Sequence, residues 1–123
     1  MARILIIDDD DQFRAMLRKM LERAGYNDIE DTAEGKVGVK LFRQNPFDLV
    51  VTDIVIPDKE GIEIIIELNR DYPGIKIIAI SGGGKIGPES YLEMAKSLGA
   101  SITLEKPFGQ SDLIDAVKEL LSE

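Results

Sequence analysis

The chain has 123 residues, with 15 basic and 23 acidic side chains, a formal net charge of −8, and neither histidine nor cysteine. This length suits one domain, and the missing residue types exclude a Ser-His-Asp triad, a thiolate nucleophile, a disulfide and the usual kind of zinc site. The negative charge argues against nucleic acid as the main ligand, because neutralising phosphates requires a basic face.

Short β-branched runs alternate with amphipathic stretches along the whole chain. Four of the strand candidates are almost continuously apolar, as expected for parallel strands covered on both faces, and the second is weak. In chain order the candidates are Ile4–Ile7, Asp28–Glu30, Leu49–Thr52, Ile75–Ile80 and Ala100–Leu104.

The first helix is the most clearly marked. Its apolar residues follow helical spacing, Asp10 or Asp11 provides an N-cap, and Gly25 stops the helix. The apolar stripe consists of Phe13, Met16, Leu17, Met20, Leu21 and Ala24.

Four further helices are predicted with signals of different strength. The second is weakened by Gly35 and Gly38, and the third is ended by Tyr72-Pro73-Gly74. The fourth begins at Pro88. The apolar residues that indicate these helices are Val37, Leu41 and Phe42; Ile62–Ile66; Leu92, Ala95 and Leu98; and Leu113, Ile114, Val117, Leu120 and Leu121.

This alternation predicts an α/β fold, a single doubly wound (βα)₅ domain with a parallel sheet in the flavodoxin-like order 2-1-3-4-5. In such sheets a ligand binds beyond the carboxyl ends of strands 1 and 3. Asp8 and Asp9 follow strand 1, Asp53 ends strand 3, Ser81 ends strand 4 and Lys106 follows strand 5. Carboxylates this close repel one another by about a few kcal/mol per pair, so their gathering favours a site for a hard cation such as Mg²⁺.

These residues resemble those of the receiver domain of bacterial two-component response regulators, and the resemblance covers the whole chain, residues 1–123. It is carried by Asp8-Asp9, the Asp53…Pro57…Gly61 segment, Ser81 and Lys106-Pro107-Phe108. Thr103 departs from the family, in which many members have an aromatic residue whose rotamer reports phosphorylation.

The resemblance implies a role for each residue of the set. Asp53 would accept the phosphoryl group, Ser81 would hydrogen-bond it and Lys106 would pair with it. Asp9, Asp53 and the carbonyl of Val55 would bind Mg²⁺ directly, while Asp8 would assist through water. A cis peptide bond before Pro107 is also expected.

The resemblance further implies a phosphorylation-dependent signalling switch that is not a conventional enzyme. A histidine kinase or phosphotransfer protein, or a small donor such as acetyl phosphate, would supply the phosphoryl group, because the chain has no histidine of its own. A downstream protein would bind through helix 4, strand 5 and helix 5. We expect a free-standing domain or one cut from a longer regulator, located in the cytoplasm because no signal or membrane span is evident.

Three other functions stay open at this point. Gly82, Gly84 and Gly87 form a dinucleotide-type motif, although it follows the fourth strand instead of the first. A flavodoxin-like carrier would share the strand order but would place four aspartates against its phosphate. An Asp-nucleophile hydrolase would need an acid two residues after Asp53, where Val55 stands.

Overall fold

The fold is a parallel five-stranded sheet between two layers of helices. The computed structural model describes residues 2–54, 61–81, 96–97 and 99–121. The described elements are β1 (Arg3–Ile7), α1 (Asp11–Arg23), β2 (Asp28–Thr32), α2 (Gly35–Gln44), β3 (Leu49–Asp53), α3 (Gly61–Asp71), β4 (Ile77–Ser81), β5 (Ile102–Glu105) and α5 (Gln110–Leu121). The strand order is β2-β1-β3-β4-β5, which confirms the predicted topology.

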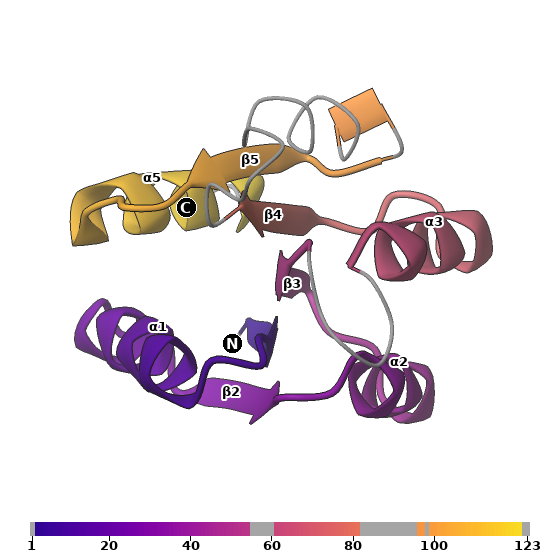
Figure 1. Ribbon diagram of the computed structural model, residues 1–123, viewed down its shortest axis with the longest axis horizontal. Coiled ribbons are helices and arrows are strands. Elements are labelled where there is room, and N and C mark those ends of the chain that lie inside the picture. The colour runs from indigo at the N-terminus through magenta and orange to yellow at the C-terminus, as the bar shows by residue number, and fades with distance from the viewer. Residues whose placement is uncertain (1, 55–60, 82–95, 98, 122–123) are drawn as a thin grey trace.

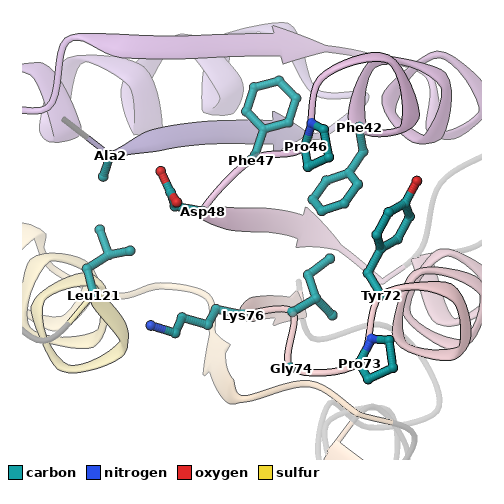
Figure 2. Close-up of a pocket in the computed structure, with 11 residues that line it drawn as sticks. Ala2, Phe42, Pro46, Phe47, Asp48, Tyr72, Pro73, Gly74, Lys76 and Leu121 are labelled. Carbon is teal, nitrogen blue, oxygen red and sulfur yellow. The ribbon is translucent and has the colours of Figure 1, made fainter.

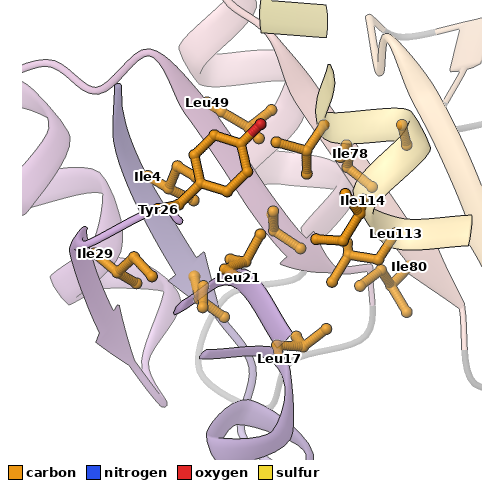
Figure 3. Packing of buried hydrophobic residues seen from close by; sticks show 14 residues of the cluster. Ile4, Leu17, Leu21, Tyr26, Ile29, Leu49, Ile78, Ile80, Leu113 and Ile114 are labelled. Carbon is orange, nitrogen blue, oxygen red and sulfur yellow. The ribbon is translucent and has the colours of Figure 1, made fainter. Parts of the chain in front are cut away.

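The sheet separates two hydrophobic layers because alternate residues of a strand point to opposite faces. In Figure 1, α1 and α5 cover one face and α2 and α3 cover the other. The first layer packs Leu17, Leu21 and Leu113 against Ile4 and Ile78, as Figure 3 shows. The second packs Phe42, Ile64, Ile65 and Leu68 against Leu5, Val50 and Ile77. Both faces of the central strands are therefore buried, which explains their continuously apolar sequences.

The boundaries of α1 follow from the signals in its sequence. Asp10 is the N-cap, and its side chain accepts hydrogen bonds from the backbone N–H groups of Gln12 and Phe13. At the other end Gly25 has φ 99°, a left-handed conformation that glycine adopts without steric cost. Of the predicted apolar stripe, Leu17 and Leu21 are buried, whereas Met16 is exposed.

Three strands differ from the prediction by two residues at one end, whereas the bounds of β1 and β3 differ from it by one residue at most. β4 begins at Ile77 instead of Ile75, because the N–H of Ile75 bonds to the carbonyl of Tyr72 in the preceding turn. β5 begins at Ile102 instead of Ala100, and the hydroxyl of Ser101 accepts a bond from the N–H of Ile77. β2 extends to Thr32, because it pairs with β1 along its full length. Its signal was weak because it lies at the edge of the sheet, where Ile29 is its one buried residue.

Gly38 allows α2 to approach the sheet closely. A Cβ on Gly38 would collide with the side chain of buried Ile7, so a larger residue would push α2 away from β1. Val39 and Phe42 form the buried face, whereas Val37 is exposed.

The predicted helix from Pro88 to Leu98 falls almost entirely outside the described residues. Among the helices in the described ranges, none is long and apolar enough to cross a membrane.

Candidate functional site at the carboxyl ends of the strands

The predicted acidic residues converge at the carboxyl edge of the sheet. Asp8 and Asp9 follow β1, and Asp53 is the last residue of neighbouring β3. One carboxylate oxygen from each of these three residues lies within 4.8 Å of the others. Two segments that are distant in sequence therefore create one group of oxygen ligands.

Asp8 is the most constrained member of this group. Its side chain is 1% exposed; Oδ1 accepts a hydrogen bond from the N–H of Asp10, at 2.9 Å, and Oδ2 has no hydrogen-bond partner among the described residues. Burial raises the pKa of Asp8 to about 6; the Asp10 N–H opposes this rise, and the charge of Asp53 adds to it. The site thus contains a buried carboxylate that needs further positive charge.

Lys106 supplies one cation to the site. Its Nζ lies 3.3 Å from Oδ2 of Asp53 and 3.8 Å from Oδ2 of Asp8. The residue follows β5, and its N–H bonds to the carbonyl of Ser81 at the end of β4. The Lys106–Pro107 bond is cis, as expected. One ammonium group beside three carboxylates leaves the cluster with a formal charge of −2.

Ser81 and Asp53 end adjacent strands. β3 pairs with β4 up to Asp53 and Ile80, so Ser81 lies one residue beyond that pair. Both residues are largely buried, with exposures of 2% for Ser81 and 8% for Asp53. The sheet therefore brings a hydroxyl group to the same rim as the carboxylates and the lysine.

The backbone around the site is held by two residues whose contacts there were not predicted, although Gly61 belongs to the Asp53…Pro57…Gly61 segment. The guanidinium of Arg14 donates to the carbonyl of Asp8 and to the carboxylate of Asp31, joining β1, α1 and β2. Gly61 begins α3, and a Cβ there would collide with the backbone carbonyl of Asp53. A glycine that follows a strand ending in aspartate is only a weak sequence signal for such a contact. Nothing in the sequence around Arg14 indicates its contacts.

Phe13 is a third residue of the site that the sequence reasoning missed. Its ring lies 3.9 Å from Nζ of Lys106, in a cation–π geometry. We expected Phe13 only as part of the apolar stripe of α1. No local pattern marks the contact, because Phe13 and Lys106 belong to opposite ends of the chain.

Several predicted features lie outside the described residues. These are Val55, Pro57 and the glycine motif Gly82–Gly87. Asp10 is described but acts as the cap of α1, and Asp11 pairs with Arg14 at the surface.

A hollow of about 570 Å³ lies at the opposite end of the sheet (Figure 2). Aromatic rings of Phe42, Phe47 and Tyr72 line it, with Asp48 and Lys76 as its charged residues. Asp48 precedes β3 whereas Asp53 ends it, so this hollow is separated from the carboxylate cluster by the length of the strand. The carboxylates, the lysine and the serine that could take part in chemistry lie together at the carboxyl edge of the sheet and not in this hollow.

The chain is similar to a known protein family and to individual members of it. The family model for the response regulator receiver domain matches residues 4–118. The chain is 31% identical to the response regulator receiver protein CpdR of Brucella abortus, over 98% of both chains. It is 30% identical to the chemotaxis protein CheY of Thermotoga maritima, over 96% of both.

Solved structures give the same result. A CheY-like receiver domain from Methanospirillum hungatei superposes with a TM-score of 0.89 at 30% identity, covering 99% of this chain and 94% of the other. The family match, the curated relatives and this structure therefore agree over nearly the full length.

Proposed function

The chain belongs to the family of response regulator receiver domains of two-component systems, and we propose that residues 1–123 form one such domain that accepts a phosphoryl group on Asp53. The observation that carries this proposal is the convergence of the carboxylates of Asp8, Asp9 and Asp53 within 4.8 Å, with Lys106 3.3 Å from Asp53. Phosphoryl transfer depends mainly on positioning and charge neutralisation, and this cluster offers both.

In the proposed reaction an oxygen of Asp53 forms a bond to phosphorus while the bond from phosphorus to the donor breaks. The donor atom is the imidazole nitrogen of a phosphohistidine, or the acyl oxygen of acetyl phosphate, and it leaves with the bonding electron pair. The acyl phosphate replaces one negative charge on Asp53 with about two. Lys106 neutralises part of the added charge, and the hydroxyl of Ser81 hydrogen-bonds a phosphoryl oxygen.

The residues present fit Mg²⁺. This ion prefers one or two carboxylates together with water and phosphate oxygens, and the cluster offers carboxylate oxygens that include the buried Oδ2 of Asp8, which accepts no hydrogen bond from the residues that the structure describes. Asp9 and Asp53 would hold the ion directly and Asp8 through water, with the carbonyl of Val55 as a further expected ligand outside the described residues. Bound Mg²⁺ supplies positive charge that offsets the negative charge of the transferring group.

The proposed partners follow from family membership. A histidine kinase or a histidine phosphotransfer protein supplies the phosphoryl group, and one relative, at 30% identity, is the sporulation initiation phosphotransferase F of Bacillus subtilis. The signal then passes to a downstream protein through β5, α5 and the predicted fourth helix, which lies almost entirely outside the described residues. We place the protein in the cytoplasm and regard it as a switch that assists its own phosphorylation, without a separate substrate to turn over.

Intact-mass measurement after incubation with acetyl phosphate and Mg²⁺ tests the proposal. We expect wild-type protein to gain the mass of one phosphoryl group, and Asp53→Asn to gain none. Asp11→Asn is the matched control, because Asp11 belongs to the same acidic run but is exposed at the first turn of α1. Equal phosphorylation of the wild type and Asp53→Asn would refute the assignment of the acceptor.

A further inference from the structure

A groove of about 500 Å³ lies between β5 and α5. The partly buried apolar side chains of Ile102, Leu104 and Phe108 line it, and these also contact the core layer beneath α5. Around them stand four exposed carboxylates, and the described lining residues include no lysine or arginine. The acidic residues are Glu105, Asp112, Asp115 and Glu119.

Most of these carboxylates are not neutralised within the described part of the chain. Asp112 accepts a hydrogen bond from the N–H of Gly109, while Glu105, Asp115 and Glu119 make no ion pair there. Two acidic residues on other faces are paired with arginines. Asp31 pairs with Arg14 and Arg18, and Asp71 pairs with Arg43. The groove therefore presents unneutralised negative charge around an apolar surface, which complements a segment with basic and apolar side chains.

Aromatic contacts connect this groove to the carboxylate cluster. Nζ of Lys106 lies 3.3 Å from Asp53 and 3.9 Å from the ring centroid of Phe13. Phe13 in turn packs edge to face against Phe108, with centroids 5.8 Å apart. Because Phe108 lines the groove, a change in the position of the ammonium group alters the ring contacts that shape it.

We propose that the groove between β5 and α5 binds a cationic, partly apolar segment of a partner protein, and that Phe13 and Phe108 couple this binding to the state of Asp53. The inference rests on the proposed function, because it takes Asp53 as the acceptor, and it defines the chemistry of the downstream partner. The coupling needs no aromatic side chain at position 103, where this chain has Thr103. Phe13 is a positioning residue, since it acts through Lys106.

The binding surface is tested with a short amphipathic peptide whose only charged residues are lysines, and with the same peptide carrying glutamate at those positions. In an NMR titration we expect the lysine peptide to shift amides of β5 and α5, and the glutamate peptide to shift none. The double variant Asp115→Asn with Glu119→Gln removes two carboxylates. It should lower the affinity for the lysine peptide about fivefold, as expected for the loss of two exposed ion pairs.

The matched control removes the same charge elsewhere on the surface. Glu34→Gln with Glu63→Gln changes the exposed N-cap residue of α2 and an exposed residue of α3, both outside the groove, and should leave the affinity near that of the wild type. An equal loss of affinity in both double variants would mean that the peptide responds only to the net charge of the protein. Chemical-shift changes centred on another face would mean that the peptide binds there. Either result overturns the proposed surface.

The coupling is tested by repeating the titration with Mg²⁺ and beryllofluoride, a stand-in for the phosphoryl group whose saturation is verified by ¹⁹F NMR. We expect the wild-type affinity for the lysine peptide to change about fivefold or more, the lower end of ordinary coupling between two sites. Phe13→Leu should bind the peptide without beryllofluoride but lose this change, and Phe13→Tyr, which keeps the ring, should retain it. A full response in Phe13→Leu would overturn the coupling.

Failure of the proposed function gives a different pattern. Protein that gains no mass from acetyl phosphate and binds no beryllofluoride would refute Asp53 as the acceptor. The titration of untreated protein would still decide whether the groove selects lysine.

Discussion

Replacing Asp8 with asparagine should stabilise the metal-free protein at neutral pH. Asp8 is 1% exposed, and within the described part of the chain its Oδ2 has no hydrogen-bond partner, so its charge is costly to bury. Asparagine keeps an oxygen that accepts the Asp10 N–H bond and removes the charge. The variant therefore isolates the cost of one carboxylate in the cluster.

The magnitude follows from the pKa of Asp8, which rises from 3.8 in the unfolded chain to about 6 in the folded one. A carboxyl group with a raised folded pKa contributes stability below its unfolded pKa and loses it as pH rises through the folded pKa. Ionisation of Asp8 therefore lowers the free energy of unfolding of the wild type by about 3 kcal/mol at pH 7.5 and by about 0.5 kcal/mol at pH 4. Asn at this position carries no charge and avoids this loss. The attraction to Lys106 lowers the pKa of Asp8 and is therefore already part of the figure, so we expect Asp8→Asn to be up to about 3 kcal/mol more stable at pH 7.5.

Urea unfolding in EDTA at both pH values measures this difference. Asp9→Asn is the matched control, because Asp9 is exposed and its charge makes the smallest contribution to the raised pKa of Asp8. We expect it to stabilise the protein too, by less than about 1 kcal/mol, while weakening metal binding and phosphorylation. If Asp8→Asn were no more stable than wild type at pH 7.5, or if its advantage persisted at pH 4, the reasoning from buried charge would be wrong.

Two further predictions concern the backbone that holds the site. Gly61→Ala should lower the free energy of unfolding by about 2 kcal/mol, because its Cβ meets the carbonyl of Asp53, whereas Gly109→Ala, whose Cβ meets only ordinary contacts, should be nearly neutral in urea unfolding. Asp10→Ala should cost about 1 kcal/mol, since α1 loses its N-cap; equal thermal midpoints for this variant and the wild type would contradict the role of the cap.

The order of the elements and most of the residues grouped at the site could be predicted from the amino-acid sequence. Apolar runs alternate with amphipathic stretches, and this alternation is a local property of the sequence. It predicted a parallel sheet, and the usual topology of such folds gave the strand order. Residues that end strands of a parallel sheet must meet at one edge, which is why Asp8, Asp53, Ser81 and Lys106 could be grouped before any coordinates were known. The cap at Asp10 and the stop at Gly25 were also local signals, and the structure has both.

Which carboxylate is buried, and which side chains surround Lys106, depends on how the helices pack on the sheet. Asp8 and Asp9 are adjacent and identical in sequence, yet the first is enclosed and the second exposed. The contact of Phe13 with Lys106, and the close approach of Gly61 to Asp53, join segments far apart in the chain. Such contacts depend on how helices pack across strands, and the periodicity of one segment carries no information about the side chains of another.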